Sequence, residues 1–205
     1  MALTRLGPIN NIINGTLGVA NGGTGLTSGT SGQFLKFTGS TTVASAAGSG
    51  ITMVDQWRYT TTTQGNVSPI TSNLERIDGT AQGTFGSSLM SESSGIFTFP
   101  STGIYLVRLD VGAYINNAKD RTWGAQIQIT NNNSNYNELA LASGNLFDSD
   151  DNTTETIGCQ TLIDVTNTTN IKVRFAVFFN NQSSYINGSS SVNKSMFTFT
   201  RIGDT

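Results

Sequence analysis

The sequence predicts an all-β, antiparallel sandwich over residues 50–205, preceded by an extended arm over residues 1–49. From Tyr105 to Ile115 every odd-numbered residue is apolar and the even-numbered positions are mixed, which is the period-two pattern of a strand with one face in a core. Clusters of Asn, Asp, Gly and Ser, residues that favour turns, separate such segments. No stretch of ten residues has a good helical period. Many short strands joined by turns are typical of a sandwich or barrel.

The N-terminal arm is rich in Gly, Thr and Ser, most densely at residues 14–28 and 40–50. An isolated segment of this composition cannot bury enough apolar surface to offset the entropy lost on ordering. We therefore expect the arm to be extended and to dock on a partner. Its sparse apolar residues are the candidates for that contact: Ile12, Ile13, Leu17, Val19, Leu26, Phe34, Leu35 and Phe37.

The second region divides into short apolar-patterned segments with turn clusters between them. In order, the predicted strands are residues 52–60, 74–78, 95–99, 103–115, 122–130, 139–147, 156–165, 171–180 and 196–202. Odd-numbered residues are apolar in several of these segments, so the predicted core needs neither a disulfide nor a metal. Each fully buried Ile, Val or Phe contributes roughly 1.5–3 kcal/mol.

Composition excludes several classes of function. Only 12% of the 205 residues are charged, and the net charge is −2 without a basic stripe, which argues against nucleic-acid binding. The chain has no histidine, which removes the usual general base and zinc ligand. Its one cysteine, Cys159, falls on an apolar face and is interpreted as a small buried hydrophobe. No run of about 18 apolar residues predicts a membrane span, and the N-terminus lacks the apolar core of a secretory signal.

Candidate sites for small ligands are weak. Gly22-Gly23-Thr24-Gly25 lacks the Gly-Lys-Ser/Thr of a phosphate loop. Asp148, Asp150 and Asn152 match the first ligand positions of a calcium loop, but Thr153 and Cys159 stand where the turn glycine and bidentate glutamate belong. A solvated acidic turn is the better interpretation, and a looser calcium site is the alternative. We expect no cofactor and no enzymatic activity, since paired carboxylates in a sugar groove are not evident.

Exposed aromatic rings could stack on sugars. Trp57, Tyr59, Trp123 and Tyr136 are the candidates, and most buried aromatic residues belong to a core. Trp123 lies on an apolar face, so a core position is favoured for it. Tyr136 lies in an Asn-rich loop and is the better candidate for a surface contact.

The segment Phe97-Thr98-Phe99-Pro100-Ser101-Thr102-Gly103-Ile104-Tyr105 resembles the Phe-x-Phe-Pro-x-x-Gly-x-Tyr wording of C1q/TNF-like jelly-roll domains. That resemblance implies a C1q/TNF-like jelly-roll sandwich that works as a homotrimer, with one sheet of each subunit facing the threefold axis. If residues 103–115 keep the family's place for this strand, their even face is the trimer interface: Leu106, Arg108, Asp110, Gly112 and Tyr114. Buried Arg108 and Asp110 would then need each other or another partner.

Residues 19–28 and 32–39 resemble the Gly-Gly-Thr-Gly segment that recurs in bacteriophage tail-fibre and related virion proteins, and residues 1–7 resemble the start of short phage appendage proteins. The combination implies a virion protein, assembled in the host bacterial cytoplasm, that is attached by residues 1–49 and displays a trimeric head. Two functions stay open: a structural fibre, decoration or connector, and an adhesin that recognises a host-surface glycan or protein.

Overall fold

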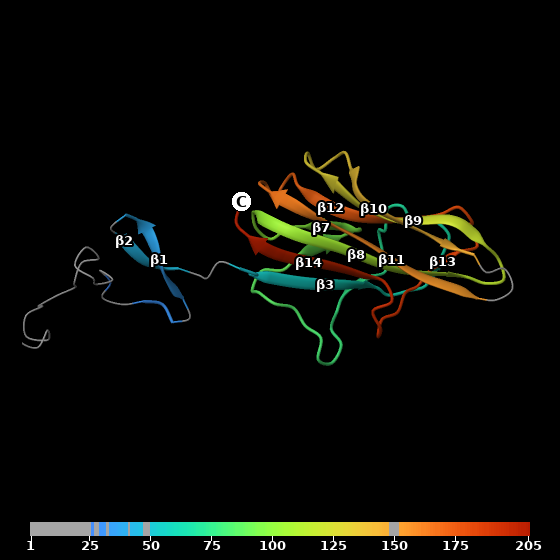
Figure 1. Ribbon diagram of the computed structural model, residues 1–205, viewed down its shortest axis with the longest axis horizontal. Coiled ribbons are helices and arrows are strands. Elements are labelled where there is room, and N and C mark those ends of the chain that lie inside the picture. Colours follow the sequence, from blue (N-terminus) through green and yellow to red (C-terminus); the bar gives the residue numbers. More distant parts are fainter. Residues whose placement is uncertain (1–25, 27–28, 32, 41, 47–49, 148–151) are drawn as a thin grey trace, which may run out of the picture. The chain divides into compact units, whose positions relative to one another are not determined.

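The described part of the chain consists of strands, turns and loops, without a helix. A computed structural model describes residues 26, 29–31, 33–40, 42–46, 50–147 and 152–205 (Figure 1). The chain divides into two compact units, residues 1–49 and residues 50–205. No helix long and apolar enough to cross a membrane occurs among the described residues.

The second unit contains two antiparallel sheets. The seven-stranded sheet runs in the order β4-β13-β8-β14-β3-β5, with β11 paired to β8. Its strands are β3 (Met53–Tyr59), β4 (Thr63–Gln64), β5 (Leu74–Arg76), β8 (Gly103–Ile115), β11 (Thr153–Val165), β13 (Tyr185–Ile186) and β14 (Met196–Gly203). The five-stranded sheet runs in the order β10-β9-β12-β7-β6. Its strands are β6 (Ser91–Ser93), β7 (Ile96–Thr98), β9 (Asp120–Thr130), β10 (Asn137–Leu146) and β12 (Lys172–Phe179).

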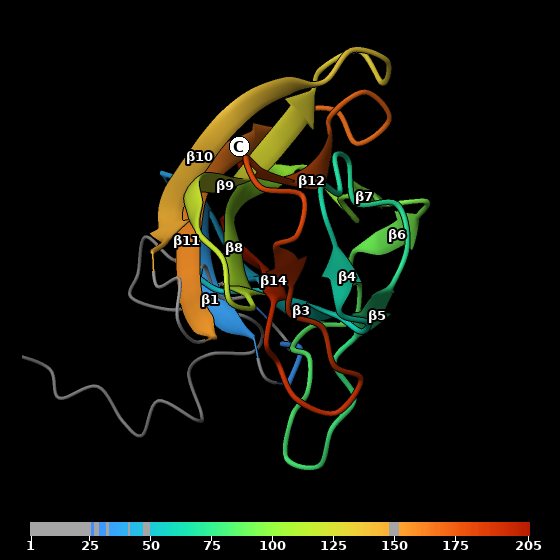
Figure 2. The same ribbon diagram turned by 90° about the vertical axis from the view of Figure 1, so that its right-hand side faces the viewer.

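The pairing pattern is that of a jelly roll. Strands distant in sequence lie side by side: β3 with β14, β8 with β11, and β7 with β12. Figure 2 looks along the sandwich and shows the two sheets facing each other, with β10 and β11 on the same flank. All nine strands that the sequence predicts are present, with ends shifted by a few residues. The short strands β4, β6 and β13 are additional.

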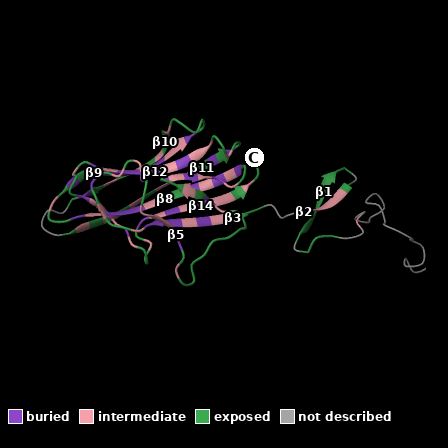
Figure 3. Cartoon of the chain, turned by 180° about the vertical axis from the view of Figure 1, so that it is seen from behind, coloured by how far each residue is buried: buried purple, intermediate pink, exposed green. Residues whose placement is uncertain are grey.

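The core lies between the sheets and is formed by the apolar face that the period-two pattern predicts (Figure 3). The odd-numbered residues of β8 from Tyr105 to Ile115 are all buried. At the centre, the Phe97 ring lies 5.3 Å from Trp57 and 5.5 Å from Phe175, both edge-on, which is a favourable aromatic geometry. Trp123 is a core residue, as the sequence indicates, and Trp57 and Tyr59 are buried as well.

The turn at Pro100–Gly103 depends on a hydrogen bond from Tyr105 and on the conformation of Gly103. The Tyr105 hydroxyl donates to the carbonyl of Ser101 over 2.9 Å, which closes the turn onto β8. Gly103 has a φ of +142°, and a Cβ there would lie 2.6 Å from the carbonyl oxygen of Gly203 on β14. Only glycine therefore allows β8 and β14 to approach at this end of the sheet.

Within the described part of the first unit, residues 34–46 form a hairpin, a local structure that the sequence did not predict. Strands β1 (Phe34–Gly39) and β2 (Thr42–Ala46) pair in antiparallel register. β1 begins with two adjacent apolar residues instead of an alternation, and Gly39 and Ser40 permit the turn. Glycine-rich composition concealed this local pattern. Of the predicted docking residues, Ile12, Ile13, Leu17 and Val19 lie outside the described residues.

Candidate interaction surface

The outward face of the seven-stranded sheet carries the residues that the sequence assigns to a trimer interface. Because antiparallel partners share a face, the register places Leu162 of β11 beside Leu106, Leu106 beside Thr200 of β14, and Thr200 beside Val54 of β3. Val54 in turn bridges Phe85. We call these five residues, Leu162, Leu106, Thr200, Val54 and Phe85, the apolar row. Its two ends are well exposed, Leu162 at 59% and Phe85 at 57%.

A charged pair lies next to the apolar row, on the same face of β8. Arg108 donates from Nε to Asp110 Oδ2 over 2.6 Å and from its second nitrogen to Oδ1 over 2.8 Å. This bidentate bond is the main cause that raises the pKa of Arg108 above its ordinary value. Arg108 is 55% exposed and Asp110 19% exposed, so the pair contributes little while water surrounds it. If the face is covered, the two charges already satisfy each other.

Two shallow hollows flank the charged pair and share it as a wall. One, of about 560 Å³, runs along β11 at Thr156, Gly158 and Gln160. The other, of about 670 Å³, lies between the pair and the loop that carries Asn193 and Lys194. The loop packs closely here, since a Cβ on Gly112 would lie 2.8 Å from the carbonyl oxygen of Lys194. Asn193 also lines this hollow, and its Oδ1 is buried without a hydrogen-bond partner in the structure.

Tyr114 lies at the opposite end of β8 from the apolar row. Its ring stacks on that of Tyr185 with centroids 4.8 Å apart and planes inclined by 6°. Burial, and then the proximity of Tyr185, raise the pKa of Tyr114. The neutral phenol is therefore preferred on this face.

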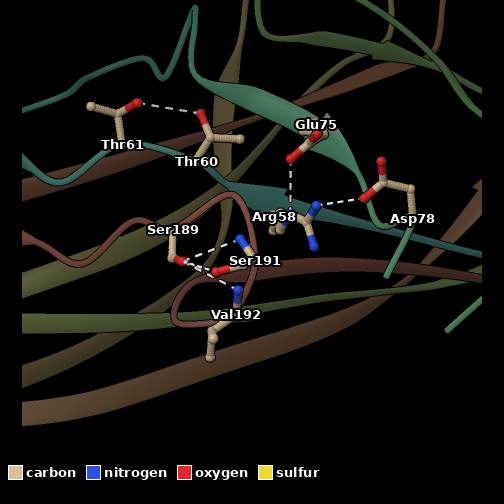
Figure 4. Close-up of polar contacts among 8 residues, drawn as sticks. All are labelled: Arg58, Thr60, Thr61, Glu75, Asp78, Ser189, Ser191 and Val192. Carbon is tan, nitrogen blue, oxygen red and sulfur yellow. Dashed lines mark hydrogen bonds and ion pairs between the residues drawn. The ribbon is translucent and has the colours of Figure 1, made fainter. Parts of the chain in front are cut away.

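Arg58 is an outward-facing residue that the sequence did not single out. It is 2% exposed, and it donates to Glu75 of β5 over 2.9 Å and to Asp78 over 2.6 Å (Figure 4). The bond to Glu75 raises its pKa, against the opposing effect of burial. The nearby loop is held by Ser189, whose hydroxyl accepts from the backbone of Ser191 and Val192 over 3.2 Å each. Arg58 thus fastens the edge of the sheet rather than presenting a charge on it.

The flank of the sandwich formed by β10 and β11 is open. No described strand pairs with the outer edge of either one, although they are ten and thirteen residues long. Neither strand contains Lys, Arg or Pro, the residues that commonly protect exposed edges. Leu139, Leu141 and Leu162 are exposed here. Glu155 fixes the flank, because its Oε2 accepts from Trp123 Nε1 over 2.7 Å and from the backbone of Asn145 over 2.8 Å.

The outward face of the five-stranded sheet is a ladder of polar side chains that satisfy one another. Arg174 donates to Gln128 over 2.8 Å, Gln128 to Gln126 over 3.0 Å, and Gln126 to Glu138 over 2.5 Å. We call these four residues the polar ladder. The Arg174 guanidinium also lies 4.0 Å from the Tyr136 ring centroid. Tyr136, the predicted surface contact, is half-buried, and burial raises its pKa.

The remaining sequence candidates do not form a second site in the described residues. Cys159 is half-buried against the core and its pKa is raised by burial, which is opposite to the shift of a reactive thiol. Asp148 and Asp150 lie outside the described residues, and Asn152 is an exposed residue at the start of β11. In the hairpin unit, Phe34, Leu35 and Phe37 are exposed, whereas Leu26 is half-buried.

Comparison with solved structures identifies the fold. The chain is similar to the Eiger TNF from S. frugiperda, with a TM-score of 0.55 and 12% identity over 76% of this chain and 95% of that one. It is also similar to murine APRIL, with a TM-score of 0.51 and 11% identity over 73% of this chain and 98% of that one. No protein-family profile matches the sequence, and no curated protein is detectably similar to it. The predicted C1q/TNF-like jelly roll is confirmed.

Proposed function

We propose that residues 50–205 form a homotrimer through the outward face of the seven-stranded sheet, and that the trimer is a structural component of a bacteriophage virion. The observation that carries the self-association is the apolar row beside the prepaired Arg108 and Asp110. The row is exposed at its ends, Leu162 and Phe85, and half-buried between them. Apolar residues grouped in this way on a domain surface are typical of an interaction surface. The resemblance to C1q/TNF-like domains implies three copies.

The partner surface is the open β10–β11 flank of the next copy. Leu139 and Leu141 are exposed on this flank, and its two strands carry no positive charge. The outward face of the seven-stranded sheet, which would contact it, carries leucines and the two hollows. Leu162 of β11 borders both surfaces, but otherwise the face and the flank consist of different residues. Their contact is therefore head to tail, and a head-to-tail contact forms a ring where its rotation closes. A ring of three covers the β10–β11 flank of every copy.

Attachment to the virion is assigned to residues 1–49. The proposal is supported by the Gly-Gly-Thr-Gly segment at residues 22–25 and by the wide spacing of Ile, Leu and Phe in this unit. Phe34, Leu35 and Phe37 are 58–69% exposed on a two-stranded hairpin, and such a hairpin is marginal in water unless another surface covers it. The protein would assemble on the particle in the host bacterial cytoplasm.

Deletion of residues 1–49 tests the attachment. The truncated chain should remain a folded trimer and be missing from purified particles. The measurement is complementation of a phage lacking this gene, followed by mass spectrometry of the particles. Truncated protein at wild-type copy number would mean that the jelly roll is the anchor, and the assignment of the two units would be reversed.

Recognition of a host surface is the second candidate function, and the polar ladder favours it. Gln126, Gln128, Glu138 and Arg174 are held in fixed positions on the outward face of the five-stranded sheet, which the proposed interface covers only at its β10 edge. A host glycan or protein contacted weakly by three such faces would be bound through avidity. Binding of the purified trimer to host cells, lost in Arg174→Ala and Gln128→Ala variants that stay trimeric, would favour the adhesin. Absence of binding by the intact trimer would leave the structural role.

A further inference from the structure

The β1–β2 hairpin has two faces of different character. The register pairs Leu35 with Ser45 and Phe37 with Val43, so Leu35, Phe37 and Val43 lie on one face. We call these three residues the hairpin face. The opposite face carries two pairs, Lys36 with Ala44 and Phe34 with Ala46, so it holds a charge as well as an exposed phenylalanine.

The polar atoms at the edge of the hairpin face are already bonded within the unit. The Ser45 hydroxyl donates to Gln33 Oε1 over 2.9 Å and accepts from the backbone of Thr30 over 3.2 Å. What remains for a partner is apolar, because Leu35 and Phe37 are 58% and 69% exposed. The only charged side chain in residues 34–46 is Lys36, on the other face.

We propose that the hairpin face packs against the same face of the other two copies, so that three hairpins form a small apolar core of their own. This inference rests on the proposed trimer of residues 50–205. An identical partner is compatible with this face, because no charge lies on it to repel its own copy, and each hairpin supplies the apolar surface that the other two need.

The tether between the two units favours this occupant over a separate protein. Thr52 is held to the jelly roll by a backbone bond of 3.1 Å to Arg201, and Ala46 is the last residue of β2. The six residues from 47 to 52 that connect β2 to this bond can span at most about 20 Å. Three chains joined through their jelly rolls therefore hold their hairpins at an effective concentration on the order of millimolar, without any further contact.

Association of the three hairpins would also reduce the surface that is available for attachment to the virion. Once the three hairpin faces cover one another, Leu35 and Phe37 are no longer available to the virion. Docking on the particle then falls to the apolar residues outside the hairpin face: Ile12, Ile13, Leu17, Val19, Leu26 and Phe34.

The test places a single cysteine on each face of the hairpin in the full-length chain. In a Cys159→Ala background, Phe37→Cys probes the hairpin face, and Lys36→Cys, its neighbour on the opposite face, is the control. Val43→Cys and Ala44→Cys form a second pair on β2. Each protein is oxidised mildly at several concentrations, and disulfide-linked pairs of chains are measured on non-reducing gels beside the mass from light scattering.

The proposal predicts at least about tenfold more cross-linked chains for Phe37→Cys and Val43→Cys than for their controls, with a yield that does not depend on protein concentration, as expected for contacts within one assembly. Equal yields on the two faces, or no cross-linking in chains that are trimeric, would overturn the hairpin contact and leave the jelly-roll trimer standing. A monomeric mass for the Cys159→Ala background would overturn both.

Discussion

The outward faces of the two sheets differ in how far their side chains are paired or covered within the chain. On the five-stranded sheet, each member of the polar ladder is bonded to the next, and the ladder requires no partner beyond water. On the seven-stranded sheet, the charged pair is satisfied in the same way, but the apolar row has no counterpart within the chain. Both faces belong to one domain with one core. This difference is the one that we expect if the face of the seven-stranded sheet is covered in the proposed trimer and the face of the five-stranded sheet is not.

A charge in the apolar row should produce the largest effect. Leu106→Asp places a carboxylate between Leu162 and Thr200, and burying it in the trimer should cost about 4–5 kcal/mol. We expect a monomeric jelly roll at micromolar concentration, measured by light scattering, with circular dichroism showing retained strands. A trimer of normal mass would place the interface elsewhere.

Tyr114→Asp compared with Gln128→Asp separates the two faces directly. At Tyr114 the new charge lies in the proposed interface beside Tyr185, and it should weaken the trimer by about 2–4 kcal/mol. Gln128 lies on the polar ladder, where a surface substitution usually changes stability by less than about 0.5 kcal/mol. The dissociation midpoints of the two variants on dilution give the comparison. Equal midpoints would show that the wrong sheet has been assigned to the interface.

Replacing one arginine on each face should again weaken the trimer more on the seven-stranded sheet than on the five-stranded sheet, by a smaller amount than the tyrosine and glutamine pair. Arg108→Ala leaves Asp110 without its bidentate partner in the interface, whereas Arg174→Ala removes a side chain from a solvated ladder. Trimer dissociation should therefore shift clearly in Arg108→Ala and remain near wild type in Arg174→Ala. Restoring the trimer by combining Arg108→Met with Asp110→Leu would show that the unpaired carboxylate, not the lost arginine, causes the weakening.

Alkaline pH should have the smallest effect on the trimer, and the size of this effect should depend on which tyrosine is replaced. The folded pKa of Tyr114 is raised above its ordinary value of 10.0, so its contribution to stability is complete below pH 10 and is lost as pH rises through the folded pKa. Burial in the proposed interface would raise this pKa further. Tyr114→Phe should therefore reduce the loss of trimer above pH 10. Tyr136→Phe, on the other face, should affect unfolding of the subunit without changing how dissociation depends on protein concentration.

The sequence pattern predicted most of the fold because alternation is a local signal. All nine predicted strands are present, and the odd-numbered core of β8 and β12 is as expected. The missed strands have specific causes. β4, β6 and β13 are two or three residues long, too short to show a period. β1 and β2 lie in a glycine-rich segment, and β1 begins with two adjacent apolar residues instead of an alternation.

Residues whose environment is built by distant segments were not predictable. Arg58 occupies a polar position of β3 and is nevertheless buried, because Glu75 and Asp78 arrive from β5 and the loop after it. Asp55 lies on the core face, where Arg76, Trp57 and the backbone of Met90 surround its carboxylate. The pattern within one strand contains no information about such partners. The apolar row likewise emerges only from the register of β3, β8, β11 and β14.

The mass of the jelly-roll domain in solution tests the central claim most directly. Residues 50–205 form a separate compact unit and can be studied without the hairpin. Light scattering at micromolar concentration should give three times the mass of a single chain of residues 50–205, and Leu106→Asp should reduce it to one chain. A well-folded wild-type domain with the mass of a single chain would contradict the account.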